Sequence, residues 1–156
     1  MVKQKLSSDV LAALSGRRLA TAESLTGGGI GSALTSVSGA SRVYAGGIIS
    51  YLNDIKHGLL GVPNELLDTL GAVSAPVARA MAEGAARALR ADVAVSVTGL
   101  AGPDGDEYGH SVGTVFIGYC DSRGSFAREY HFRGDREQVR EQTIESALRL
   151  ILEQNP

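Results

Sequence analysis

The sequence has little cysteine and no long run of apolar residues or of charges of one sign. Its single cysteine, Cys120, excludes an internal disulfide, and no zinc-ligand spacing is present. No apolar stretch approaches the roughly 20 residues that span a bilayer. The N-terminus turns polar at once and lacks the apolar core of a signal peptide. These absences predict a cytoplasmic protein that needs neither a disulfide nor a metal ion.

Charges of the two signs are nearly balanced, with 15 Lys and Arg against 17 Asp and Glu, a net charge of −2. This balance argues against a nucleic-acid duplex or an anionic membrane as the main partner, and leaves a local basic pocket for a small anion open. The chain has 156 residues and no visible repeat or linker, so we expect a single domain over residues 1–156.

Hydrophobic periodicity and turn signals predict helices that alternate with strands. Helices are expected over 7–16 (with serines at its start), from the glycine-rich segment to about 37, over 54–60, over 63–70, after Ser74 and after Asp135, which forms a capping box with Gln138. Strands are expected over 17–24, 46–51, 93–99, 113–120 and 125–132, the last two joined by a hairpin turn over 121–124. Helical crossovers favour parallel pairing of the first strands, and the final hairpin requires an antiparallel neighbour. We therefore expect an α/β protein, a three-layer α/β/α sandwich with a mixed, mostly parallel sheet of about five strands.

Three predicted strands end in polar residues that precede glycines or the start of a helix. Ser24 ends the first strand, Tyr51 the second and Thr98 the third. In open α/β sheets, ligands gather at the carboxyl ends of the strands. The coincidence of three such ends predicts a site at one edge of the sheet.

The segment ESLTGGGIGS (23–32) places Ser24 at a strand-to-helix turn. Glycines after the serine let backbone N–H groups approach a ligand, and the positive end of the next helix favours a phosphate or a developing oxyanion. A tight turn with a serine cap is the alternative. Neither the dinucleotide fingerprint nor a phosphate loop ending in Gly-Lys-Ser/Thr is present, so ATP hydrolysis is not expected.

The segment YLNDIK (51–56) places a lysine near the start of a helix. If Asn53 is the N-cap, Lys56 is the third helical residue, beside the positive end of the helix, which lowers its pKa. A neutral lysine can take a proton from a serine hydroxyl, and Ser-Lys is a known variant of the hydrolase triad. A solvated surface lysine is the competing interpretation.

Two further segments are candidates for ligand contact. TGLAGPDG (98–105) opens a long loop, which is either a lid or binding loop or a plain surface connection. Arg136 falls in the first turn of the last helix, where its charge opposes the helix dipole. A bound anion would account for it, and a solvent-exposed arginine is the alternative.

Taken in order, these segments resemble the C-terminal domain family of CinA, the competence- and damage-inducible protein, from about residue 5 to 153. The landmarks are TAESLTGG (21–28), YLNDIK (51–56), GAVS (71–74), VTGLAGPDG (97–105), VGTV (112–115) and GDR (134–136). The resemblance implies a homo-oligomeric amidohydrolase of pyridine nucleotide salvage. Such an enzyme converts nicotinamide mononucleotide to nicotinic acid mononucleotide and ammonia, with no cofactor or metal.

The same resemblance assigns roles to individual residues. It implies that Ser24 is the nucleophile, Lys56 the general base and Tyr51 a hydrogen-bonding partner of that pair. It further implies that the substrate and oxyanion contacts come from Thr26, Gly27, Gly28, Thr98, Gly99 and Arg136. Leu25 and Leu52 stand where members often have a cysteine and a small residue, which affects the shape of the pocket.

Two other functions stay open. In many relatives this domain is fused to a pyrophosphatase-like domain, and some fused relatives lack deamidase activity. The alternative function for this chain is a catalytically silent nucleotide-binding module that serves a separately encoded pyrophosphatase-like partner. An acyl or peptide hydrolase with the same dyad is the third possibility, although no apolar or extended substrate groove is evident.

Overall fold

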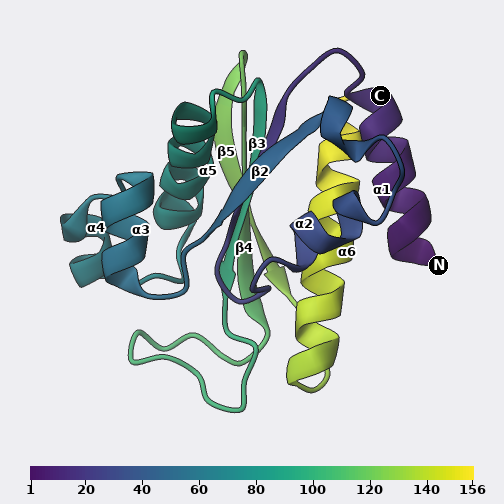
Figure 1. The fold of residues 1–156 in the computed structure, drawn as a ribbon. Coiled ribbons are helices and arrows are strands. Elements are labelled where there is room, and N and C mark those ends of the chain that lie inside the picture. Colours follow the sequence, from purple (N-terminus) through teal and green to yellow (C-terminus); the bar gives the residue numbers. More distant parts are fainter.

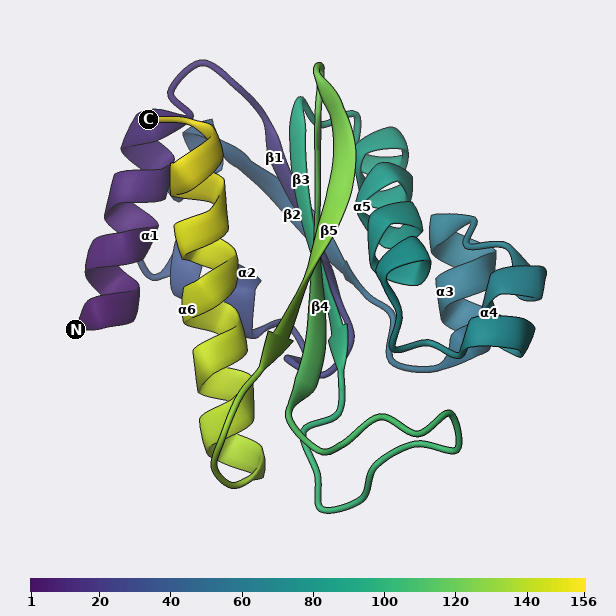
Figure 2. The same ribbon diagram turned by 180° about the vertical axis from the view of Figure 1, so that it is seen from behind.

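The computed structural model describes residues 1–156 and consists of three layers, with a sheet between two groups of helices (Figures 1 and 2). One face of the sheet is covered by α1 (Val2–Ala13), α2 (Gly29–Thr35) and α6 (Arg136–Gln154), and the other by α3 (Asn53–Leu60), α4 (Asn64–Leu70) and α5 (Ala75–Leu89). The predicted α/β/α sandwich is confirmed. No helix combines the length and the apolar character needed to cross a bilayer.

The sheet has five strands in the order β2-β1-β3-β4-β5. Their bounds are β1 (Leu19–Glu23), β2 (Tyr44–Ile49), β3 (Val93–Gly99), β4 (Thr114–Asp121) and β5 (Gly124–His131), and a 3₁₀ turn, η1 (Ala40–Arg42), precedes β2. β1 pairs in parallel with β2 and β3, whereas the β3–β4 and β4–β5 pairs are antiparallel. Four strands therefore run in one direction and β4 opposes them, which confirms the expected mixed sheet. Because β1, β2 and β3 are parallel, their carboxyl ends meet at one edge.

The central strands are buried because helices cover both faces of the sheet. Every residue of β1 is buried, and in β3 all but the last are. Such burial explains their near-continuous apolar and small side chains. The larger core cluster, which includes Leu34 and Leu148, lies on the side of α1, α2 and α6; the smaller one, which includes Leu60 and Met81, lies on the side of α3 and α5. The sheet is thus held between two separate cores.

Two local predictions agree with the structure. The Asp135 carboxylate accepts from the Gln138 N–H, and the Gln138 side chain accepts from the Asp135 N–H, each at 2.9 Å. This capping box makes Arg136 the first residue of α6. The β4–β5 turn also forms as expected, with Asp121 opposite Gly124. Both signals are contained within a few residues, so neighbouring sequence was enough to predict them.

Other boundaries differ from the prediction. The first helix begins at Val2, before the serines that were expected to start it, because Leu6 already shares its buried face with Val10. Asn53 is not the N-cap of α3: its side chain makes no capping bond, and Leu52 takes that position. The carbonyl oxygen of Leu52 accepts the first helical hydrogen bonds, so Lys56 is the fourth helical residue instead of the third.

Helix α3 packs closely on α5 at Gly84. A Cβ at this position would collide with the backbone carbonyl of Leu60, at the end of α3. Glycine thus permits a helix–helix approach that a larger residue prevents. Because α3 also carries Lys56, this contact helps to set the depth at which that side chain is buried.

We predict that Gly84→Ala lowers the free energy of unfolding by about 1–3 kcal/mol, because the added methyl group overpacks against backbone. Gly58, inside α3, provides the control, since a Cβ there meets nothing within 4 Å. Gly58→Ala should be neutral or stabilising by up to about 1 kcal/mol, because alanine is the better helix former. Urea denaturation measures both values, and equal effects would contradict the close approach at Gly84.

Candidate active site

The carboxyl ends of the three parallel strands surround a cleft of about 390 Å³. The register places Glu23, the last residue of β1, beside Ile49 of β2 and Val97 of β3, so the residues that follow leave the sheet together. Six predicted site residues line this cleft: Ser24, Tyr51, Lys56, Thr98, Gly99 and Arg136. The structure therefore brings together groups that are up to 112 residues apart in sequence, as 136 − 24 = 112.

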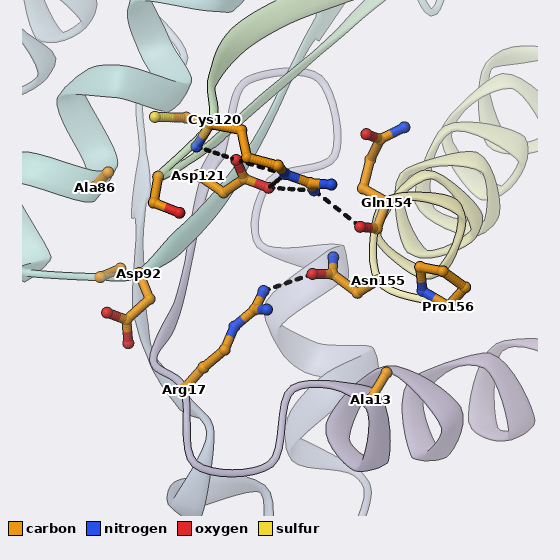
Figure 3. A pocket seen from close by; sticks show the side chains of 12 residues that line it. Ala13, Arg17, Ala86, Asp92, Cys120, Asp121, Gln154, Asn155 and Pro156 are labelled. Carbon is orange, nitrogen blue, oxygen red and sulfur yellow. Dashed lines mark hydrogen bonds and ion pairs between the residues drawn. The ribbon is translucent and has the colours of Figure 1, made fainter.

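A larger cavity, of about 730 Å³, lies at the opposite end of the sheet and borders none of the predicted site residues (Figure 3). Its charged groups already have partners within the chain. Arg123 donates to Asp121, whose pKa it holds at about 2, and Arg17 donates to the Asn155 side chain. Cys120 also lines this cavity as a free thiol, but burial raises its pKa and so disfavours the reactive thiolate. We therefore place the candidate active site in the smaller cleft.

The main feature of the cleft is a buried lysine in contact with a serine. Lys56 is 1% exposed, and its Nζ lies 2.9 Å from the Ser24 Oγ. Nζ also donates to the backbone carbonyl oxygens of Ser50, at 2.8 Å, and Tyr51, at 3.0 Å. Burial lowers the pKa of Lys56 from 10.5 to about 8, and no carboxylate forms an ion pair with it.

These three contacts orient the amine once it is neutral. A neutral amine has two N–H donors and one lone pair, and carbonyl oxygens can only accept hydrogen bonds. The two N–H groups therefore bind Ser50 and Tyr51, and the lone pair is left to face the Ser24 hydroxyl. This geometry allows Lys56 to accept the Ser24 proton as a general base.

A buried carboxylate, Glu23, was missed by the sequence analysis. It is 2% exposed and accepts hydrogen bonds from the N–H groups of Ile30, at 2.9 Å, and Gly31, at 3.0 Å. It also accepts from the Thr26 hydroxyl, at 2.6 Å. The expectation that the N-terminus of α2 binds a ligand anion is therefore wrong, because Glu23 already occupies these donors. An acidic residue at the end of the buried strand LATAE was the available signal.

The glycine-rich turn holds three predicted site residues, Thr26, Gly27 and Gly28. Thr26 is buried, and its hydroxyl donates a hydrogen bond to the Glu23 carboxylate. Gly27 and Gly28 adopt φ angles of +60° and +99°. None of the three borders the cleft. Within the turn, however, the backbone N–H groups of Leu25 and Thr26 donate to no other protein atom. They are the free donors nearest in sequence to the candidate nucleophile.

Tyr51 and Arg136 form a second group of contacts at the mouth of the cleft. Arg136 donates to the Tyr51 hydroxyl, at 3.2 Å, and to the Gly102 carbonyl oxygen, at 2.6 Å. Tyr51 is 58% exposed, and its backbone carbonyl oxygen accepts a hydrogen bond from Lys56. The phenol group of Tyr51 contacts Arg136 and not the Ser24–Lys56 pair. No carboxylate pairs with Arg136, so its positive charge stays available to a ligand.

The remaining wall is formed by the end of β3 and the loop that follows it. The Thr98 hydroxyl donates to the Ala72 carbonyl oxygen, at 2.9 Å, which ties β3 to the segment before α5. In the loop, Asp106 binds the His110 ring, at 2.7 Å, and the Tyr108 hydroxyl donates to the Asp68 carbonyl oxygen. These bonds hold the long loop in place beside the cleft. Neither here nor elsewhere does the chain group three His, Cys, Asp or Glu side chains for a metal ion.

Comparisons with known proteins agree on one family. The profile of the CinA C-terminal domain matches residues 3–155. A CinA-like protein from a Synechococcus species is 49% identical over 150 residues, which cover 94% of this chain and 36% of that protein. A CinA-like protein from Geobacter metallireducens is 48% identical over 133 residues, which cover 85% and 32%. The chain thus spans about a third of the length of these curated relatives.

A solved structure gives the same result for the fold. The crystal structure of the competence/damage inducible protein CihA from Agrobacterium tumefaciens superposes with a TM-score of 0.95. The two chains are 36% identical, and the match covers 100% of this chain and 97% of that one. The likeness therefore extends over the whole sandwich, including the strands whose ends form the cleft.

The lowered pKa of Lys56 predicts a pH-dependent stability. The folded state releases this proton near pH 8, whereas the unfolded chain keeps it up to about 10.5. The folded state then binds fewer protons than the unfolded state, so stability rises with pH across this window. The penalty for burying the charge is fully present below pH 8. Relative to Lys56→Met, the wild type should gain about 2 kcal/mol between pH 8 and 10.

Urea denaturation of the two proteins at several pH values measures this gain. Tyrosine residues also titrate at alkaline pH, but their contribution cancels in the difference between the two proteins. A difference that stays constant from pH 7 to 10 would show that burial does not lower the pKa of Lys56.

Proposed function

This chain belongs to the CinA C-terminal domain family, and we propose that it is an amidohydrolase that converts nicotinamide mononucleotide to nicotinic acid mononucleotide and ammonia. The proposal depends on the Lys56 Nζ, which is buried 2.9 Å from the Ser24 Oγ without a carboxylate partner. Burial of an amine without a counter-ion is costly. A silent nucleotide-binding module has no need for that arrangement, whereas a hydrolase uses the amine as its base.

The proposed reaction begins at the Ser24 hydroxyl. Neutral Lys56 takes its proton while the Ser24 Oγ attacks the carboxamide carbon of the substrate. The carbonyl oxygen becomes an oxyanion, which the free N–H groups of Leu25 and Thr26 stabilise. Protonated Lys56 then passes its proton to the amide nitrogen. The carbon–nitrogen bond breaks, ammonia leaves, and an acyl group remains on Ser24.

Water completes the reaction. Lys56, again neutral, takes a proton from a water molecule, which attacks the acyl carbon. The ester bond to Ser24 breaks, and the serine recovers its proton from Lys56. The acid product leaves with one oxygen from water in place of the nitrogen, so the sum is amide plus water to carboxylic acid plus ammonia.

The phosphate of the substrate is assigned to Arg136. This guanidinium lines the same cleft as Ser24 and Lys56 and has no carboxylate partner. It stands in the first turn of α6, a helix of 19 residues, where the helix dipole repels a cation and attracts an anion. A phosphate bound to Arg136 removes this unfavourable interaction. The cleft volume of about 390 Å³ lies in the range of small-molecule sites.

The first prediction of this proposal is that the purified protein releases ammonia from nicotinamide mononucleotide, with or without EDTA. Ser24→Ala and Lys56→Met should each abolish turnover, and the double variant should be no worse than either, because the two residues act as one unit. Lys56→Arg is the matched control. It keeps the donors and the charge, cannot lose its proton, and should therefore also be inactive.

A coupled ammonia assay and chromatography of the acid product provide the measurement. The wild-type kcat/KM should rise with pH up to about 8, as Lys56 becomes neutral. A flat profile over this range would contradict the role of Lys56, and activity that a chelator removes and a divalent ion restores would contradict the mechanism. Nucleotide binding without ammonia release would favour the silent binding module.

The second prediction concerns the phosphate. A charge-assisted hydrogen bond contributes roughly 1.5–3 kcal/mol, which is about 10- to 150-fold in affinity. Arg136→Ala should raise KM for nicotinamide mononucleotide by about that factor and leave hydrolysis of nicotinamide riboside, which lacks the phosphate, almost unchanged. Arg133→Ala is the control, because Arg133 is exposed nearby but does not line the cleft. Equal losses on both substrates would mean that Arg136 does not bind the phosphate.

A further inference from the structure

A second arginine of α6, Arg140, is bound to the backbone of the turn that follows Ser24. Its Nε donates to the Leu25 carbonyl oxygen, at 2.9 Å, and its Nη2 donates to the Thr26 carbonyl oxygen, at 3.2 Å. The side chain is half-buried, and no carboxylate forms an ion pair with it. Both hydrogen bonds of this guanidinium are therefore directed to the serine turn.

The bond to Leu25 fixes the direction of one N–H group. The peptide between Leu25 and Thr26 is trans, so its C=O and N–H point in opposite directions. With the C=O held against Arg140, the Thr26 N–H points away from α6. That N–H donates to no protein atom, although Thr26 is only 1% exposed. Buried backbone N–H groups are normally hydrogen-bonded, and with no protein acceptor this one is available to an oxygen placed beside Ser24.

Two other bonds hold the same turn. The Ser24 carbonyl oxygen accepts from the Gly27 N–H, at 3.2 Å, and by the same peptide geometry this turns the free Leu25 N–H the opposite way. Glu23 binds the Thr26 hydroxyl, at 2.6 Å. Thr26 is therefore held between a carboxylate at the end of β1 and a guanidinium on α6.

We propose that Arg140 is a positioning residue, which orients and polarises the Leu25–Thr26 peptide so that its N–H stabilises the oxyanion formed at Ser24. The inference rests on the proposed function, since it requires nucleophilic attack by Ser24 on a carbonyl. A cation on a peptide oxygen withdraws electron density and strengthens the N–H of the same peptide as a donor. The stronger donor matters most when negative charge develops in the transition state, so its loss lowers kcat more than it changes KM.

Kinetics of Arg140→Ala and Arg140→Lys in the full chain test this role. Removal of one oxyanion donor costs about 10²- to 10³-fold in kcat; Arg140→Ala weakens a donor without removing it and should lose about 10- to 100-fold, with KM changed by less than about 3-fold. The pH dependence set by Lys56 should not move. Added guanidinium should restore part of the lost kcat. Arg149→Ala, an exposed arginine of the same helix, is the control and should behave as the wild type.

Labelling of Ser24 by a fluorophosphonate separates this inference from the identity of the substrate. The reaction needs the nucleophile and the oxyanion donors but no nicotinamide, and its rate should fall in Arg140→Ala. If the wild type is labelled but does not hydrolyse nicotinamide mononucleotide, the proposed function fails and the labelling rates still test Arg140. Wild-type rates in the variant, or a raised KM with kcat unchanged, would overturn the role of Arg140, and an unlabelled wild type would overturn both proposals.

Arg140→Lys keeps the test decisive if the alanine variant folds poorly. Lysine retains the charge but lacks the planar fork that binds two oxygens at once, so it should recover stability but only part of kcat. Urea denaturation provides the comparison. A lysine variant with wild-type kcat would mean that charge alone suffices and that the fixed orientation proposed here is wrong.

Discussion

The site depends on one contact, between the Lys56 amine and the Ser24 hydroxyl. This amine is buried, and no carboxylate balances its positive charge when it is protonated. Water is excluded from the amine, and two backbone carbonyl oxygens with the serine are its hydrogen-bond partners. Such a site is tolerable only if the surrounding elements hold it rigidly. The close approach of α3 to α5 at Gly84 and the convergence of three parallel strand ends supply that rigidity. The same burial that destabilises the ammonium form makes the neutral base available near pH 8.

Charges around the serine turn are divided between structural and ligand-directed roles. Glu23 satisfies the first N–H groups of α2, and Arg140 satisfies two carbonyl oxygens of the turn. Both side chains are thus committed to backbone. Arg136 differs, because it lines the cleft and has no carboxylate partner. The separation explains how a protein with a net charge of −2 can still present a local positive charge to an anionic ligand.

The position of the site follows from the direction of the strands more than from the size of the cavities. The larger cavity lies at the amino ends of the parallel strands, where its charged side chains are hydrogen-bonded to other groups of the chain. The smaller cleft lies at the carboxyl ends, where chain segments leave the sheet with polar side chains and free N–H groups. The fold is shared with the Agrobacterium tumefaciens protein at a TM-score of 0.95, but an activity belongs to the groups in the cleft and not to the sandwich itself.

The sequence alone determined the sandwich, the strand over 93–99, the capping box of α6 and the meeting of Ser24, Tyr51 and Thr98 at one edge. These features follow from periodicity and from pairs of residues a few positions apart. The tertiary structure decided the roles of Glu23 and Arg140 and the N-cap of α3. Arg140 reaches Leu25 across 115 positions of sequence, and Glu23 binds backbone groups seven and eight residues away. Local patterns carry no information on which backbone group a distant side chain meets, because that depends on how the layers pack.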